Sequence, residues 1–280
     1  MTPPHGDQPI SARRHLLLAA LAWPAAAARA QARAPGEVLI GGTGAGMAPL
    51  QQAVGQHKGL RWVPNLSTSG GLKALQAGAI DIALAGRSLT EPERAQGLVD
   101  QPLFRTPYVF AVHGDVPVRA VTLDQLAALY AGRTNQWPDG QPVRLVLRPA
   151  SDGDTSFVKS LGPGLAEAVG LAHARPGNPV AMVDAEAIEA LDRIGGSLGV
   201  TTLGLVRAER RRLHVLDLDG VRPEADALIA KRYPHSKTVY LVSRGKRRPE
   251  EIAVIALFSE AAVAQALHKL ACVPAPARPA

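Results

Sequence analysis

The sequence has almost no cysteine and few aromatic residues. Among 280 residues the only cysteine is Cys272, and aromatic residues make up 4% of the chain. A single cysteine allows neither an intrachain disulfide nor a cysteine-based zinc site, so the fold must depend on its apolar core. Few rings also argue against a surface that stacks sugars or bases, and we expect no nucleic-acid partner.

Patterns typical of enzymes and metal sites are missing as well. The histidines are scattered, with no pair at metal-ligand spacing, and the sequence contains no Gly-x-Ser-x-Gly motif. We therefore expect a binding protein rather than an enzyme, with no metal and no cofactor.

Long apolar runs are also missing, except for a short one near the N-terminus. The pair Arg13-Arg14 precedes the apolar stretch 16–23, and small residues that include Ala30 and Ala32 follow it. The run is shorter than the ~20 residues that span a bilayer. A basic segment, a short apolar core and an Ala-x-Ala site describe a secretory signal peptide. We assign residues 1–30 to it, with export to the periplasm by the general secretory or the twin-arginine route; an uncleaved amphipathic helix is the alternative.

Positive charge exceeds negative charge, with a formal net charge of +7 at pH 7. A positive balance favours anionic ligands. Two basic runs, 207–212 and 246–248, hold much of this charge, and no aromatic residue lies within them. Solvated helix ends and loops explain both runs best.

Strand-like and helix-like segments alternate after the signal. Strands are predicted at 37–40, 60–64, 80–85, 103–113, 143–147, 198–203, 213–216 and 237–243. Helices are predicted at 48–57, 70–77 with Ser69 as cap, from Thr90 with a Thr90/Glu93 capping box, at 122–130, 155–161 and 185–194, and over 249–270 as one helix or two. This alternation predicts an α/β fold with a largely parallel sheet.

Three loops each follow a predicted strand and open a predicted helix: 41–46, 67–71 and 148–156. The first N–H groups of a helix have no intrahelical partner, and the helix dipole adds partial positive charge there. Such a junction can hold an anion, and glycine lets the ligand approach the backbone. A tight turn, a plain helix cap and a solvated Asp-rich turn, respectively, remain the alternatives. The first loop has neither dinucleotide-binding nor P-loop spacing.

Nine short stretches are individually modest motifs, but their order along the chain is specific when they are taken together: 41–46, 69–83, 87–90, 123–126, 130–133, 135–137, 148–157, 195–200 and 233–241. Together they resemble the phosphate-binding protein family that serves ABC importers. The resemblance implies a two-lobed periplasmic-binding-protein fold of type II, with two hinge crossovers and a ligand cleft between the lobes. It also implies phosphate or a related oxyanion as ligand and an ABC permease in the inner membrane as partner. We expect a monomer.

By the same resemblance, lobe 1 comprises 35–113 plus 205–272, and lobe 2 comprises 114–204. The last segment, 273–280, contains three prolines and is expected to be a disordered tail. The predicted ligand-binding residues are Thr43, Gly44, Ala45, Ser69, Gly70, Arg87, Arg148, Gly153, Asp154 and Thr155.

Two positions depart from the family pattern. Arg87 stands where phosphate binders place an aspartate after the third strand, and the loop that usually reads Ser-Gly-Thr is Gly153-Asp154-Thr155, preceded by Asp152. A carboxylate at a helix start competes with an anionic ligand for the same N–H groups. Arg87 and Asp154 are candidates to pair across the cleft. Two functions follow: capture of an oxyanion for an importer, or an extracytoplasmic sensor or adaptor of the same fold with altered or lost phosphate binding.

Overall fold

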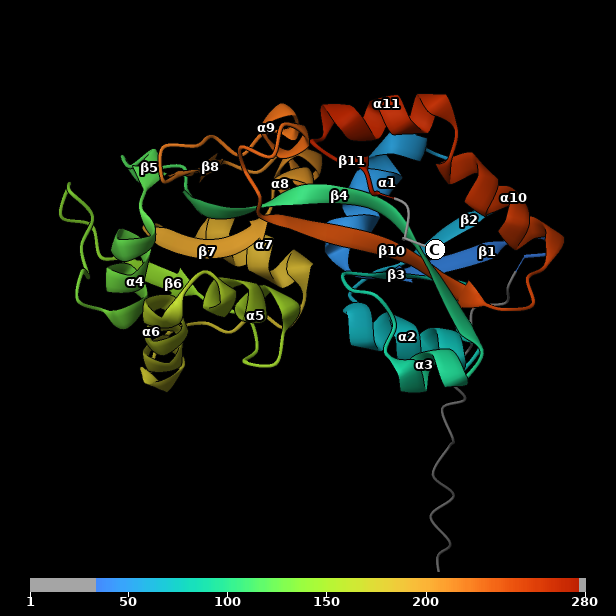
Figure 1. The fold of residues 1–280 in the computed structure, drawn as a ribbon, viewed down its shortest axis with the longest axis horizontal. Helices are drawn as coiled ribbons and strands as arrows, with labels where there is room; N and C mark the ends of the chain where they lie inside the picture. The colour runs from blue at the N-terminus through green and yellow to red at the C-terminus, as the bar shows by residue number, and fades with distance from the viewer. Residues whose placement is uncertain (1–33, 277–280) are drawn as a thin grey trace, which may run out of the picture. The chain divides into compact units, whose positions relative to one another are not determined.

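Helices are interspersed with strands along the chain in a computed structural model, which describes residues 34–276 (Figure 1). The strands are β1 (Val38–Gly42), β2 (Leu60–Val63), β3 (Ile82–Ala85), β4 (Leu98–His113), β5 (Ala120–Val121), β6 (Arg144–Val146), β7 (Ser197–Thr202), β8 (Leu213–Val215), β9 (Asp217–Leu218), β10 (Ser236–Arg244) and β11 (Val273–Pro274). The helices are α1 (Gly44–Val54), α2 (Thr68–Gln76), α3 (Glu91–Ala95), α4 (Leu123–Ala131), α5 (Gly153–Ser160), α6 (Pro163–Ala174), α7 (Asp184–Arg193), α8 (Leu203–Glu209), α9 (Ala225–Ile229), α10 (Pro249–Phe258) and α11 (Ala261–Lys269).

The long strand β4 joins two sheet regions. Strand order is β2-β1-β3-β10-β4-β7-β6. The first half of β4 pairs antiparallel with β10, and its second half pairs antiparallel with β7 and β8. We call β1, β2, β3, β10 and the first half of β4 the first sheet region. The second half of β4 with β6, β7 and β8 is the second sheet region.

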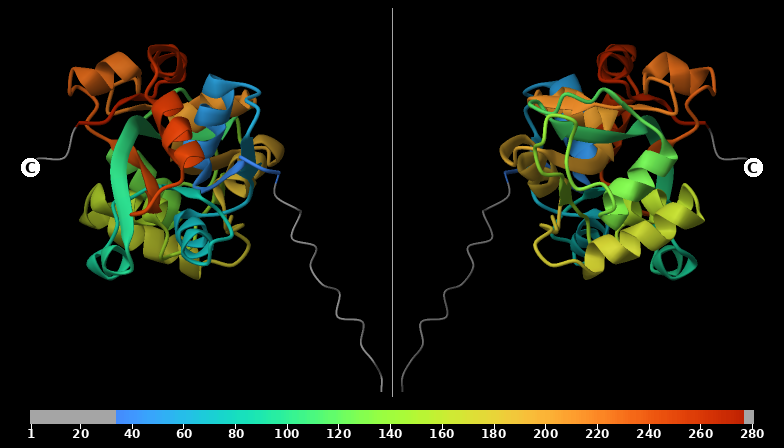
Figure 2. Two further views of the ribbon diagram at one scale, coloured as in Figure 1. Left: turned by 90° about the vertical axis from the view of Figure 1, so that its right-hand side faces the viewer. Right: turned by 90° about the vertical axis from the view of Figure 1, so that its left-hand side faces the viewer.

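In the first sheet region, β1 pairs in parallel with β2 and β3. The run Ile82–Ala85 is buried throughout, as expected for a strand covered on both faces. Ile82 and Leu84 join a core with α1, α10 and α11, whereas Ala83 and Ala85 join a core with α2. Alternate residues of a strand point to opposite faces, so one short strand contributes to both cores. The two helix layers lie on opposite sides of the strands in Figure 2.

In the second sheet region, the largest core lies on one face, under α4, α5 and α6. It includes Phe110, Tyr130 and Trp137. Helix α7 covers the other face through Ala187 and Leu191. Segments that follow α8 also reach the larger core, which contains Leu216, Leu218, Ala227 and Tyr233. The bounds predicted for the two lobes remain a prediction.

Several helix starts match the predictions. Thr90 and Glu93 form the predicted capping box of α3, and Thr122 caps α4. The cap predicted for α2 is wrong: Ser67, not Ser69, accepts the Gly70 N–H at 3.2 Å. The helix therefore begins earlier than predicted, because Ser67 has the extended backbone that a cap requires. The C-terminal stretch forms two helices, α10 and α11.

The predicted disorder of 273–280 is wrong for the first part of this segment. Val273 and Pro274 form β11, which pairs with Phe104 and Arg105 of β4. The apolar side chain of Val273 is buried, and this burial fixes the segment. The predicted signal peptide, 1–30, lies outside the described residues. Within 34–276 no single helix is long and apolar enough to cross a bilayer; α10 and α11 pass that test only as a pair, with a 52° bend between them.

Candidate ligand-binding site

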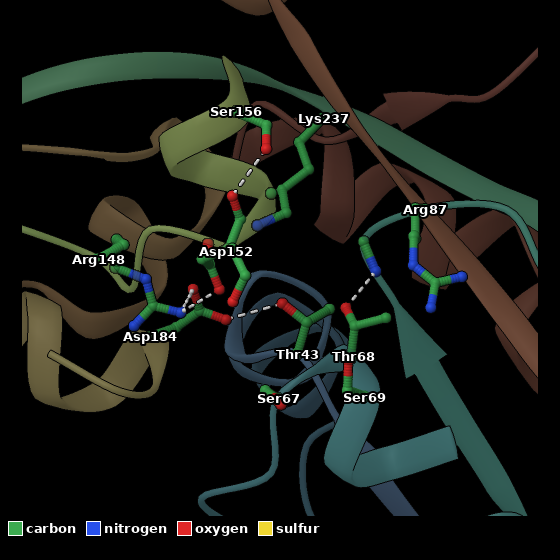
Figure 3. Close-up of a pocket in the computed structure, with 13 residues that line it drawn as sticks. Thr43, Ser67, Thr68, Ser69, Arg87, Arg148, Asp152, Ser156, Asp184 and Lys237 are labelled. Atoms are coloured by element: carbon green, nitrogen blue, oxygen red, sulfur yellow. Dashed lines mark hydrogen bonds and ion pairs between the residues drawn. The ribbon is translucent and has the colours of Figure 1, made fainter. Parts of the chain in front are cut away.

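The starts of four helices, α1, α2, α5 and α7, border one cavity of about 250 Å³ between the two sheet regions (Figure 3). It is lined by Thr43, Ser67, Thr68, Ser69, Gly86, Arg87, Arg148, Ser151, Asp152, Gly153, Ser156, Asp184 and Lys237. Loops at the carboxyl ends of parallel strands commonly form such a crevice. Each helix directs free N–H groups and partial positive charge toward its own start, so the cavity suits an anion.

The turn from β1 into α1 depends on Gly42. The backbone N–H of Thr43 donates to the carbonyl of Leu84 on β3 at 2.9 Å, which holds the start of α1 against the neighbouring strand. Gly42 has φ +133°, and a Cβ at this position would lie 2.1 Å from the Leu84 carbonyl oxygen. Only glycine meets both requirements, so this position fixes how α1 approaches the cavity.

The predicted ligand-binding residues divide into two groups in the structure. Thr43, Ser69, Arg87, Arg148 and Gly153 line the cavity. The others are outside that lining set and lie next to it in the sequence: Gly44 and Ala45 in the first turn of α1, Gly70 in α2, and Asp154 and Thr155 in α5. The structure thus brings the three predicted loops together.

At the start of α2, backbone donors remain open to the cavity. Ser67 accepts from Gly70, and the Thr68 hydroxyl accepts the Gly86 N–H at 2.9 Å. Within residues 34–276, the N–H groups of Thr68 and Ser69 donate to no protein acceptor. Ser69 is exposed. Two backbone donors and one hydroxyl are therefore available to a ligand.

The start of α5 is capped by a carboxylate. The side chain of Asp152 accepts the Asp154 N–H at 2.8 Å, and the backbone carbonyl of Asp152 accepts from Ser156. The Thr155 hydroxyl donates to the Arg148 carbonyl at 3.2 Å, away from the cavity. The Asp152 carboxylate thus accepts a hydrogen bond from one of the free N–H groups at the start of α5, where an anionic ligand could otherwise bind.

Arg148 is the buried cation of the cavity, with 3% of its side chain exposed. It donates to the Ala181 carbonyl at 2.9 Å and to the Asp152 carboxylate at 3.3 Å. Its guanidinium also lies 3.6 Å from Asp184 and 3.7 Å from Asp154. Within the described residues its Nε forms no hydrogen bond, although it is buried.

Lys237, at the start of β10, provides a second buried cation that the prediction missed. Its Nζ lies 2.6 Å from the Asp154 carboxylate, to which the Tyr108 hydroxyl also donates at 3.1 Å. Burial raises the pKa of Asp154 and acts to lower that of Lys237, but the charges of Asp154 and Asp184 outweigh burial and raise the pKa of Lys237. Lys237 therefore stays protonated.

Asp184, the first residue of α7, is a further site residue that the prediction missed. Its carboxylate accepts the Thr43 hydroxyl at 2.7 Å and the Ala45 N–H at 3.3 Å. Burial acts to raise the pKa of Asp184, but the charges of Lys237 and Arg148 and the Thr43 hydrogen bond hold it below its ordinary value. The only local signal in the sequence is the position of Asp184 at a helix start. Aspartate is common at such positions, so this signal does not identify a site residue.

The predicted pairing of Arg87 with Asp154 is wrong. Arg87 donates twice to Glu93, at 2.8 Å each, and 44% of its side chain is exposed at the cavity rim. These bonds raise the pKa of Arg87 and lower that of Glu93 to about 2. Glu93 lies on α3, six positions after Arg87, so it is much closer to Arg87 in the sequence than Asp154 is. Asp154 is paired with Lys237 instead.

The fold and the site define an α/β solute-binding protein of the type II periplasmic-binding-protein class. The family model described as "PBP superfamily domain" matches residues 27–263, and the chain belongs to this family. The family and the type II fold predicted from the sequence are thereby confirmed. The predicted largely parallel sheet is wrong, because β10 pairs antiparallel with β3 and β4, and β4 pairs antiparallel with β7.

Among curated proteins, the chain is 26% identical over 221 residues to the phosphate-binding protein PstS of Bacillus subtilis, a match that covers 74% of this chain and 70% of that protein. Among solved structures, it resembles a candidate substrate-binding protein of a phosphate ABC transporter from Clostridium perfringens, solved with bound phosphate (TM-score 0.67, 17% identity, covering 86% of this chain and 100% of that one). It also resembles a phosphate-binding protein from Stenotrophomonas maltophilia (TM-score 0.65, 13% identity, covering 86% and 91%).

Proposed function

We propose that this chain is an extracytoplasmic solute-binding protein that captures a small oxyanion, phosphate first, and delivers it to an ABC permease in the inner membrane. One observation carries the proposal: the open start of α2 borders the same cavity as the buried guanidinium of Arg148. Backbone donors, hydroxyls and an arginine fork together match the oxygens of a tetrahedral anion.

The relatives favour phosphate among the oxyanions. The relative from Bacillus subtilis is a phosphate-binding protein, and the structural relatives are a protein of a phosphate ABC transporter with bound phosphate and a phosphate-binding protein. The cavity volume, about 250 Å³, suits a small ligand better than a peptide or an oligosaccharide. In this role the chain binds its ligand as a monomer and does not convert it. We expect the purified chain to hydrolyse no phosphate ester and to have the mass of a monomer by light scattering.

Isothermal titration calorimetry tests this function directly. The chain without residues 1–30 is titrated with phosphate, sulfate, molybdate and tungstate at pH 7.5. We expect saturable heat with phosphate that competition with a second oxyanion reduces. A folded protein that gives no heat with any member of the panel would contradict the proposal.

A second function, an extracytoplasmic sensor or adaptor without oxyanion transport, is favoured by one observation. Asp152 and Asp184 already contact Arg148, and Asp184 also contacts the start of α1. Under this alternative, carboxylates of the protein itself occupy the donors of the cavity that an oxyanion would use. A well-folded parent that gives no heat with the oxyanion panel would favour this alternative over an importer component.

A further inference from the structure

The carboxylate of Asp184 lies where an anionic ligand of α1 would be held. It accepts from the Thr43 hydroxyl at 2.7 Å and from the Ala45 N–H at 3.3 Å. Gly44 permits this approach, because a Cβ at that position would lie 2.7 Å from the Cβ of Asp184. An internal carboxylate thus engages both the hydroxyl and the N–H that a bound oxyanion would use. Figure 3 shows its contact with the Thr43 hydroxyl.

The second oxygen of Asp184 faces the cation of the site. It lies 3.6 Å from Arg148, whose buried Nε forms no hydrogen bond within the described residues. The side chain of Asp184 is only 8% exposed, so this charge is poorly screened by water. Asp184 therefore engages the start of α1 and approaches the buried guanidinium at the same time.

The charges around Asp184 indicate how its carboxylate affects the binding of an anionic ligand. We define the charged cluster as Asp152, Asp154, Asp184, Arg148 and Lys237. Its three carboxylates outnumber its two cations, although burial raises the pKa of Asp154, and a bound oxyanion adds a further anionic group to this set. A like charge that is held close in a partly buried site is strongly unfavourable.

We propose that Asp184 is an internal competitor of the ligand: its carboxylate occupies the start of α1 and lowers the affinity of the cavity for oxyanions. This inference rests on the proposed function, since it requires that the cavity takes an oxyanion. The contact also joins α7, which covers the second sheet region, to α1 of the first. Binding therefore requires the Thr43–Asp184 hydrogen bond to open or the carboxylate to become neutral.

The variant Asp184→Asn tests the competition, because it keeps the side-chain shape and removes the charge. Phosphate affinity is measured by calorimetry at pH 7.5 for the parent, Asp184→Asn and Asp184→Ala. The control is Glu189→Gln, which removes one negative charge from an exposed position of the same helix, where Glu189 pairs with Arg193 at 3.0 Å. We expect phosphate to bind at least tenfold tighter in both Asp184 variants and unchanged in the control. Circular dichroism melts verify folding.

The outcomes separate this inference from the proposed function. A purely structural role for Asp184 predicts weaker binding in both variants. A parent that binds phosphate as tightly as Asp184→Asn, or more tightly, overturns the competition and leaves the proposed function standing. If neither the parent nor the variants bind phosphate, the proposed function fails and the competition fails with it.

A crystal structure of the parent grown with phosphate gives a test that needs no variant. We expect phosphate at the start of α1 and the Asp184 carboxylate displaced from the Thr43 hydroxyl. Phosphate seated in the cavity with the Thr43–Asp184 hydrogen bond intact would overturn the inference.

Discussion

Ser69 offers a direct way to test whether the start of α2 holds the ligand. It is exposed, lines the cavity and lies in the first turn of α2, where the N–H groups of Thr68 and Ser69 have no protein acceptor within 34–276. The substitution Ser69→Asp places a carboxylate beside these donors. A negative charge in the first turn stabilises a helix by about 0.3 to 1 kcal/mol, so the variant is expected to fold at least as well as the parent.

The magnitude follows from Coulomb's law. At a separation of about 6 Å, two unit charges repel by about 0.7 kcal/mol in water and by about 2.8 kcal/mol at an effective dielectric constant of ~20. Ser69 is exposed, so the value lies between these limits. The expected loss of phosphate affinity is therefore roughly 3-fold to 100-fold, since about 1.4 kcal/mol corresponds to tenfold.

Calorimetry with Ser69→Asp, the neutral isostere Ser69→Asn and the parent measures this loss. We expect Ser69→Asn to bind within about threefold of the parent, because the backbone donors remain. The penalty of Ser69→Asp should shrink when the ionic strength rises, because exposed charges are screened by salt. Equal affinity of Ser69→Asp and Ser69→Asn at low salt would refute the assignment of α2 to the ligand.

Three further predictions concern the walls of the cavity. Lys237→Met removes the nearer of the two cations from the buried Asp154 carboxylate and should lower the free energy of unfolding by about 3 kcal/mol in urea melts, whereas an unchanged midpoint would contradict the buried pair. Gly42→Ala forces a Cβ into backbone at positive φ and should cost at least about 2 kcal/mol in the same assay; a parent-like melt would show that the β1–α1 turn tolerates a side chain. The pKa of Glu93, lowered from 4.5 to about 2, should return toward its ordinary value in Arg87→Gln when followed by NMR. Because this pKa is depressed in the folded state, the ion pair stabilises the parent above about pH 4.5, and that advantage should disappear as the pH falls toward 2.

Local signals in the sequence were sufficient for much of the fold. The apolar run 80–85 predicts a buried strand, which the structure forms over Ile82–Ala85, and the Thr90/Glu93 spacing predicts the capping box of α3. Helix α6 was not predicted, although Pro163 at its first position is a known start signal, because its glycines and alanines give little contrast between an apolar and a polar face.

The candidate site was predictable only in part. The three loops were recognisable because each combines a strand end with a helix start, which is a local pattern. Asp184 reaches Thr43 across 141 positions of sequence, and Lys237 reaches Asp154 across 83. Such partners are set by the packing of the two sheet regions, and no local spacing encodes them. Arg87 differs, because its partner Glu93 lies only six positions away, so the local carboxylate takes precedence over the predicted distant Asp154.

Strand β4 changes partner at one point along its length. Pro107 is the last of its residues opposite β10, and Tyr108 is the first opposite β7. Proline has no backbone N–H to donate to a neighbouring strand, so β4 changes partner at a position where one hydrogen-bond donor is missing. The two sheet regions thus share one unbroken strand, so a movement of one region relative to the other would have to bend or twist the β4 backbone.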